Sequence, residues 1–273
     1  MEEIVHVVPL GIEYDRAVTP FKGSSRFKPN RVYILTIPKS SKAPFTIVEQ
    51  HCEKAEKVKA FLKKQKVEVI VVETDLINIL DVMKKISNII REERKSGNIV
   101  YVNLSSAGRL TSIAAAFAGM FHNVKTYYVK PNGYSKSPEE REKHGITIVE
   151  GRDIIFLENF EILIPDELGL KVIVEIHKNR KMKSIDIIQF LVRTKEEGFE
   201  NYYAVRTRKQ KSKLLMKLNR RVMEKLENSG YVRKNKIGRE KEYELTNSGE
   251  YIAHLCGLIP IDKKDIHKEN KLP

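Results

Sequence analysis

Short apolar runs rich in β-branched residues alternate with longer segments of helical periodicity throughout the first half of the chain. Strands that lack polar alternation are typical of a parallel sheet whose two faces are both covered. The segments between them have apolar residues at helical spacing and end at polar or glycine-containing turns such as Gly97-Asn98. The sequence therefore predicts an α/β domain with a Rossmann-like, doubly wound parallel sheet. The predicted strands are 4–9, 31–37, 67–72, 99–104 and 124–129, with a last strand within 147–157, and the predicted helices are 44–66, 75–95 and 110–121.

The loop after the fourth predicted strand, Asn103-Leu-Ser-Ser-Ala-Gly-Arg109, leads directly into an alanine-rich helical segment. In a doubly wound sheet, ligands bind outside the carboxyl ends of the strands, near the point where the strand order reverses. The loop offers free backbone N–H groups, two hydroxyls and a guanidinium, which together suit an anion. It is neither Gly-x-Gly-x-x-Gly nor a P-loop, so an ordinary NAD or ATP site is disfavoured. Taken alone, the loop is equally consistent with a capped helix start that contains a packing glycine.

A cationic stretch in the second half of the chain, 213–232, has one apolar and one basic face when it is drawn as a helix. The segment from Arg206 to Met223 contains no acidic residue, and the whole chain has a net charge of +14 and a pI near 9.5. Such a charge attracts nucleic acid or another polyanion. The alternative is a solvated amphipathic helix that happens to be basic. The apolar stripe is Leu215, Leu218, Val222 and Leu226, and the opposite stripe is Lys213, Lys217, Arg220 and Arg221.

Two strand-like runs that flank a basic, glycine-containing turn follow this helix, which predicts a charged hairpin between Tyr231 and Leu245. The segments Leu226-Glu-Asn-Ser-Gly-Tyr-Val232 and Tyr243-Glu-Leu-Thr-Asn-Ser-Gly249 resemble those of winged-helix transcription regulators. The resemblance implies a helix in the major groove, with Arg220 or Arg221 reading guanine, and a hairpin tip near the phosphates. The predicted DNA-binding residues are Lys211, Lys213, Lys217, Arg220 and Arg221 on the helix and Arg233, Lys234, Lys236 and Arg239 on the wing.

A second polar loop, with Gly11, Asp15 and Arg16, follows the first predicted strand. Together with this loop, the Rossmann-like half, the loop after its fourth strand and the winged helix resemble the CRISPR-associated Rossmann fold (CARF) regulators. The turn departs from that family at Ser106-Ala107, where a pair of glycines is common. The resemblance implies a homodimer that binds cyclic oligoadenylate, in particular cyclic tetra-adenylate, across its two-fold axis, and that regulates transcription from a palindromic operator in double-stranded DNA. The ligand-binding residues that it implies are Gly11, Asp15, Arg16, Ser105, Ser106, Gly108 and Arg109.

The expected domains are 1–164 for ligand sensing and dimerisation, 165–258 for the winged helix-turn-helix, and a polar tail, 259–273, that frays. The segment from Lys171 to Ile176 fits a helix or a strand by periodicity. Helices are also expected over 184–194 and 247–258, the latter as a closing helix.

Two cysteines, Cys52 and Cys256, lie far apart without a ligand pattern, so neither a disulfide scaffold nor a zinc site is expected. No cofactor is expected, and no apolar run is long enough to span a membrane, which indicates a cytoplasmic protein. The alternative function is that of a slow, metal-independent ring nuclease that cleaves cyclic oligoadenylate in the dimer pocket, although no general base is evident there. A third alternative is an architectural or RNA-binding protein without a ligand.

Overall fold

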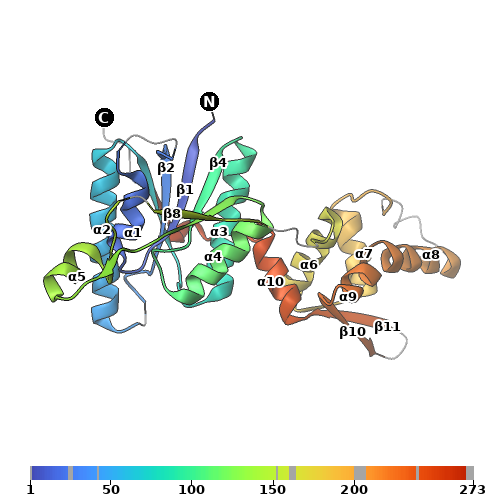
Figure 1. Cartoon of the computed structure of the whole chain (residues 1–273). Helices are drawn as coiled ribbons and strands as arrows, with labels where there is room; N and C mark the ends of the chain where they lie inside the picture. The colour runs from blue at the N-terminus through green and yellow to red at the C-terminus, as the bar shows by residue number, and fades with distance from the viewer. Residues whose placement is uncertain are drawn as a thin grey trace. The chain divides into compact units, whose positions relative to one another are not determined.

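The computed structural model describes residues 2–23, 27–41, 43–151, 153–159, 164–199, 207–237 and 240–268. The chain forms two compact units (Figure 1). One unit contains Met1–Ile162 together with Pro260–Pro273, and the other contains Leu163–Ile259. None of the helices in the described ranges combines the length and the apolarity that crossing a bilayer requires.

The first unit is built on a mostly parallel sheet, with the strand order β12-β3-β2-β1-β4-β5-β8 among the described residues. The expected Rossmann-like fold is therefore confirmed, with antiparallel strands at both edges, where β8 pairs with β5 and β12 with β3. The parallel strands are β1 (Ile4–Pro9), β2 (Arg31–Thr36), β3 (Glu68–Glu73), β4 (Ile99–Asn103) and β5 (Lys125–Val129), and the antiparallel edges are β8 (Ile154–Leu157) and β12 (Ile266–Lys268).

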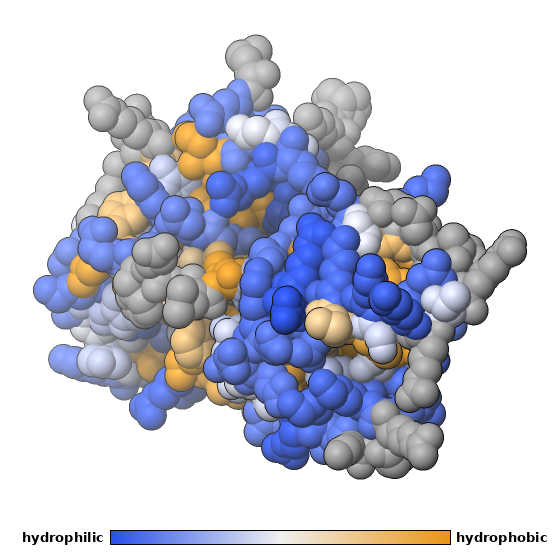
Figure 2. Space-filling model, turned by 90° about the vertical axis from the view of Figure 1, so that its right-hand side faces the viewer, coloured by the Kyte–Doolittle hydropathy of each residue, from blue (hydrophilic) through white to orange (hydrophobic). Residues whose placement is uncertain are grey.

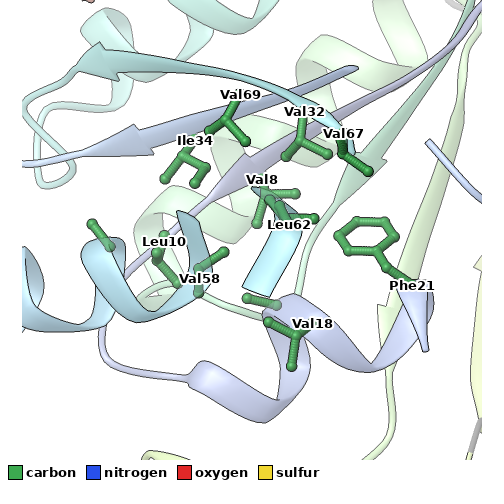
Figure 3. Close-up of a cluster of buried hydrophobic side chains, with 12 residues drawn as sticks. Val8, Leu10, Val18, Phe21, Val32, Ile34, Val58, Leu62, Val67 and Val69 are labelled. Atoms are coloured by element: carbon green, nitrogen blue, oxygen red, sulfur yellow. The ribbon is translucent and has the colours of Figure 1, made fainter. Parts of the chain in front are cut away.

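Helices cover both faces of this sheet, as the nonalternating strands require. Figure 1 shows α1 and α2 on one face and α3 and α4 on the other. The hydrophobic core between the sheet and α2 includes Val8, Ile34 and Leu62, which are fully buried (Figure 3). The elements are α1 (Tyr14–Val18), η1 (Thr19–Phe21), α2 (Phe45–Lys64), α3 (Ile79–Lys95) and α4 (Arg109–Phe121), followed by an excursion with β6 (Gly133–Tyr134), α5 (Pro138–His144) and β7 (Thr147–Ile148).

The end of the chain corrects one expectation, because the polar tail does not simply fray. After the short helix η4 (Lys263–Asp265), Ile266 pairs with Val72 and Lys268 with Ile70, so that β12 covers the edge of β3. Asp265 also forms an ion pair with Lys85 at 3.0 Å. An open strand edge leaves backbone N–H and C=O groups without partners. Backbone pairing satisfies these groups whatever the side chains are, so the polarity of the tail did not reveal the strand.

The second unit has the element order of a winged helix, with a three-stranded sheet in the order β10-β11-β9. The segment 171–176 is helical, and Val172, Ile173 and Ile176 are buried on one face, so the strand alternative is wrong. The elements are α6 (Glu167–Asn179), β9 (Lys181–Lys183), α7 (Ser184–Arg193), α8 (Arg208–Leu218), η3 (Asn219–Met223), α9 (Glu224–Asn228), β10 (Val232–Ile237), β11 (Glu240–Leu245) and α10 (Asn247–Leu255).

The predicted basic helix is continuous through α8, η3 and α9, with one π-helical turn at η3. Leu218, Val222 and Leu226 of the predicted stripe are buried, and Leu215 is half-buried. The π turn adds one residue to the inner face, because Met223 is buried beside Val222. The C-terminal half of this helix therefore forms part of the domain core, while most of α8 remains exposed.

Candidate ligand and nucleic-acid sites

The order of the sheet reverses between β1 and β4, so the loops that follow these two strands meet at the switch point. The Gly11 N–H donates to Ser106 O at 2.8 Å. A Cβ built on Gly11 would lie 3.5 Å from Ala107 Cα, which shows how closely the two loops approach. The structure thus brings together the two loops that the sequence singled out.

The two serines of the β4 loop have their hydroxyls committed to the protein itself. Ser105 Oγ donates to Asn103 Oδ1 at 2.6 Å and accepts from Val129 N–H at 3.1 Å. Ser106 Oγ donates to Pro9 O at 2.7 Å. Both residues are buried, with exposed fractions of 1% and 0%. Their hydroxyls therefore shape the turn and are not presented at its surface.

Asp15 and Glu13 anchor the excursion that contains α5 and β7. Asp15 Oδ2 accepts from Val149 N–H at 3.1 Å and lies 2.8 Å from His144 Nδ1. Glu13 Oε2 accepts from both the N–H and the hydroxyl of Thr147. Because both carboxylates are buried and already paired, Asp15 acts as an anchor of the first loop in this structure.

The parts that remain open to an anion are Gly108, Arg109 and the start of α4. Gly108 is the N-cap of α4 and, among the described residues, its first-turn N–H groups receive no side-chain cap. Gly108 and Arg109 are exposed. Arg16 lies behind them, half-buried, and donates from Nη1 to Ser105 O at 3.1 Å with its guanidinium 5.2 Å from the centre of the Tyr128 ring.

His51 is a residue of this region that the sequence analysis missed. It lies on α2, and its Cε1 would be 3.7 Å from a Cβ built on Gly11. Burial lowers the pKa of His51, although a hydrogen bond with the backbone of Leu10 acts in the opposite direction. The imidazole is therefore neutral at pH 7. A histidine on a covering helix gives no sequence signal of this position, which depends on how α2 packs against the β1 loop.

The structure divides the cationic stripe of the long helix into two kinds of residue. Lys217 Nζ donates to Gly198 O at 2.8 Å, and Arg221 Nη1 donates to Glu197 O at 2.7 Å, so both hold the turn after α7. Lys213 and Arg220 are exposed and make no side-chain hydrogen bond within the part of the chain that the structure describes. Together with the exposed Met216 they border a shallow hollow of about 430 Å³.

A deeper groove, of about 500 Å³, runs between the start of α7, the exposed side of α8 and β11. Its lining includes Lys211, Arg220 and Tyr243, together with Lys183 and Glu240, which form an ion pair at 2.8 Å. The face of the molecule in Figure 2 is mainly hydrophilic. Basic side chains on α8 thus border two adjoining concave surfaces.

Two cations of the wing, Lys234 and Arg233, are paired with acids. Lys234 Nζ lies 2.7 Å from Glu227 Oε1, and this hydrogen bond raises the pKa of Lys234. Arg233 lies 3.7 Å from Glu244, which also pairs with Lys181 at 3.1 Å. Lys236 is on β10 but its side chain, like the whole of Arg239, lies outside the described residues. In its described part the wing is therefore closer to neutral than its lysines and arginines suggest.

Comparison with known proteins gives matches for both units. Residues 4–134 match the family model described as HFX_2341_N-like, N-terminal, and residues 169–257 match the DUF6293 C-terminal winged helix domain. No curated protein matches the chain.

Three solved structures show a low similarity to the chain. Protein VC1899 from Vibrio cholerae is 12% identical, with 92% of this chain and 64% of that chain covered and a TM-score of 0.39. Can2 from Sulfobacillus thermosulfidooxidans, in complex with cyclic tetra-adenylate, is 11% identical, with 92% and 63% covered and a TM-score of 0.40. Csm6 from Enterococcus italicus, bound to cyclic hexa-2'-fluoro-hexa-dAMP, is 12% identical, with 83% and 58% covered and a TM-score of 0.38.

The chain spans less than two thirds of the length of each of these three proteins. The family models rest on the sequence, and together they account for most of both units. The C-terminal match confirms the expected winged helix domain. The chain thus combines an N-terminal part that matches the HFX_2341_N-like model with a DUF6293 C-terminal winged helix domain.

Proposed function

We propose that the chain is a DNA-binding transcription regulator that responds to an anionic nucleotide ligand. The observation that carries the DNA-binding half is the exposed pair Lys213 and Arg220 on the long helix of a winged helix domain. In a winged helix domain the third helix enters the major groove. Here the long helix of α8, η3 and α9 holds that position, after α6 and α7. An arginine in that groove can bridge O6 and N7 of guanine, which supports Arg220 as the base-reading residue.

The proposed ligand site is the start of α4 with Gly108 and Arg109, held in place by the buried serines behind it. A helix N-terminus and a guanidinium both favour phosphate oxygens. The ligand class, a cyclic oligoadenylate such as cyclic tetra-adenylate, comes from the CARF resemblance of the two loops. One copy of this open turn covers little of so large an anion, whereas two copies related by a two-fold axis can enclose it.

An apolar stripe on α4 supports dimerisation next to that site. Leu110, Ile113 and Phe117 lie on one face of the helix and are 41%, 49% and 40% exposed. The stripe begins one residue after Arg109, so a second copy packed against it would bring two Arg109 side chains toward one axis. A two-fold dimer would also present two winged helices, which favours a palindromic operator.

Substituting Arg109 by alanine is expected to weaken the binding of cyclic tetra-adenylate by about 10-fold to 100-fold without unfolding the domain. The reason is the loss of charge-assisted hydrogen bonds worth about 1.5–3 kcal/mol from an exposed side chain. Isothermal titration calorimetry measures the Kd. Lys95→Ala is the control, because Lys95 is an exposed cation in the last turn of α3 and outside the proposed site. Equal Kd values for wild type and Arg109→Ala would contradict the assignment of the ligand site to the start of α4.

Phe117→Glu is expected to convert the protein from dimer to monomer, because it places a charge within the apolar stripe. Analytical ultracentrifugation over a range of concentrations measures the shift. Phe45→Glu is the matched control, since Phe45 is 78% exposed on α2, on the other face of the sheet. A wild-type chain that stays monomeric throughout the range, or a Phe117→Glu variant that dimerises as wild type does, contradicts this interface.

The second candidate function, cleavage of the cyclic ligand, is favoured by one observation, the neutral His51 beside Gly11. A neutral imidazole can accept the proton of a ribose 2'-hydroxyl as a general base. Incubating the protein with cyclic and linear oligoadenylates and following the products by chromatography separates the two functions. A regulator binds the cyclic ligand and releases it intact, a nuclease converts it to linear products that His51→Ala no longer forms, and an architectural protein does neither.

A further inference from the structure

Two histidines and a glutamate of the winged helix unit converge where the ends of α6 and α10 meet. His177 lies in the last turn of α6, and Glu250 and His254 lie on α10. One ligand atom from each residue lies within 4.8 Å of the others, and all three residues are half-buried. This cluster has no part in the proposed ligand or DNA sites.

The hydrogen bonds of the cluster fix the protonation of one ring. His254 Nδ1 lies 2.8 Å from the backbone oxygen of Glu250. A carbonyl oxygen only accepts, so Nδ1 carries a proton, and in the neutral ring Nε2 then has the lone pair. A metal-binding histidine usually donates its other N–H in this way to a backbone or carboxylate oxygen. His254 is therefore in the tautomer that a metal ion requires.

The other contact is one that a cation can replace. His177 Nδ1 and Glu250 Oε2 are 2.8 Å apart and share a proton. The rings of His177 and His254 meet edge to face, with centroids 4.8 Å apart. Glu250 and His254 are four residues apart on α10 and so lie on one face of the helix. Both histidines are in the last turns of their helices, where the helix dipole favours positive charge.

We propose that His177, Glu250 and His254 bind one divalent transition-metal ion and that zinc fits this donor set best. Two imidazoles and a carboxylate are ligands that zinc accepts, with the fourth position open to water. Neighbouring ligand atoms in a tetrahedral zinc site are about 3.4 Å apart for bonds of about 2.0–2.1 Å. The ligand atoms now lie within 4.8 Å of one another, so side-chain rotations that bring them closer by up to about 1.4 Å would reach that spacing. The bound ion ties α10 to α6.

The sequence predicts no metal site, because neither cysteine has a ligand pattern, whereas the three donors come together only through the packing of α6 against α10. His177, on α6, lies more than seventy residues before Glu250 and His254, which are on α10. The inference is independent of the proposed regulator function, since it concerns how the winged helix domain is held together.

Titration of the chelator-treated, full-length protein with zinc chloride is expected to show one strong site per chain by calorimetry. Cobalt(II) at the same site is expected to give the intense visible absorption of a tetrahedral complex. His177→Gln and His254→Gln should each weaken zinc binding by more than about tenfold. Zinc should also raise the Tm of the wild-type protein more than that of either variant at the same zinc concentration.

Two control variants separate this site from adventitious binding. His267→Gln removes another histidine that pairs with a glutamate, because His267 Nε2 lies 3.2 Å from Glu73 Oε1, but that pair has no second histidine. Cys256→Ala removes the thiol nearest in sequence to His254. Both controls should bind zinc as wild type does. Circular dichroism verifies that each variant is folded. If the wild type takes up no zinc, or if folded His254→Gln binds it as tightly as wild type, the three residues form only a hydrogen-bonded contact between helices.

Discussion

Gly249→Ala is expected to destabilise the winged helix domain by about 3 kcal/mol or more, which is a large fraction of the stability of a domain of this size. A Cβ at this position would lie 2.1 Å from Tyr231 O and 3.1 Å from Tyr231 C. These are backbone atoms of the residue that leads into β10, so no side-chain rotation can relieve the overlap. The substitution must push α10 away from the start of the wing.

The hydrogen bonds around Gly249 explain why that movement costs so much. Thr246 N–H donates to Tyr231 O, and Thr246 Oγ accepts from Gly249 N–H at 3.1 Å as the N-cap of α10. The same hydroxyl donates to Gly230 O at 2.6 Å. Separating α10 from Tyr231 therefore breaks the cap and the contact with the preceding turn together.

Urea denaturation followed by circular dichroism measures the free energy of unfolding of each variant. Ser248→Ala is the matched control, because it places the same methyl group at the neighbouring, exposed position of α10. Gly230→Ala is an intermediate case. Gly230 has a φ of +72° but open space around its Cβ position, so a loss of about 1 kcal/mol is expected. A Gly249→Ala variant as stable as Ser248→Ala would show that the turn adapts without loss.

Arg220→Ala is expected to weaken binding to the cognate operator by about 1–3 kcal/mol and to change binding to unrelated duplexes much less. The reason is that Arg220 is exposed on the long helix and makes no side-chain hydrogen bond within the described ranges. Lys213→Ala should also weaken binding, but more evenly across sequences, since an ammonium acts as a point charge. Selection from random duplexes followed by fluorescence anisotropy at several salt concentrations measures both effects.

The ion pairs of the wing provide an internal control for this assignment. Because Lys234 is paired with Glu227, Lys234→Ala should cost little affinity. Glu227→Gln removes the competing carboxylate, so it should strengthen binding to all duplexes and steepen the salt dependence by up to about one unit. The contrary result is that Arg220→Ala weakens specific and non-specific binding equally while the wing variants alter sequence preference. That result would assign base reading to the wing and phosphate contact to the helix.

Lys217 and Arg221 differ from the other cations of the long helix because their side chains also hold the turn after α7. The sequence placed them on the same stripe as Lys213 and Arg220, but in the structure they donate to the carbonyl oxygens of Gly198 and Glu197. Loss of either side chain would therefore combine any effect on DNA with a loosened turn after α7. Their contribution to DNA binding can be read only beside a measurement of stability.

Local sequence patterns were sufficient for the architecture of both units. The runs without polar alternation predicted a covered parallel sheet, and the four-residue spacing of Leu218, Val222 and Leu226 predicted the buried face of the long helix. The glycines of the wing motif indicated a winged helix before the structure showed that Gly249 has no room for a Cβ. These features depend on periodicity and backbone conformation, which neighbouring residues largely determine.

Only the tertiary structure decided which of the polar residues are available to a partner. Ser105, Ser106 and Asp15 have the side chains of a ligand site, yet their oxygens are used by backbone groups that lie far away in the sequence. His51, the strand β12 and the cluster of His177, Glu250 and His254 likewise arise from packing between distant segments. A sequence states which donors and acceptors a chain possesses, whereas their hydrogen-bond partners are set by the fold, because buried polar groups must be satisfied by whichever groups the packing brings near.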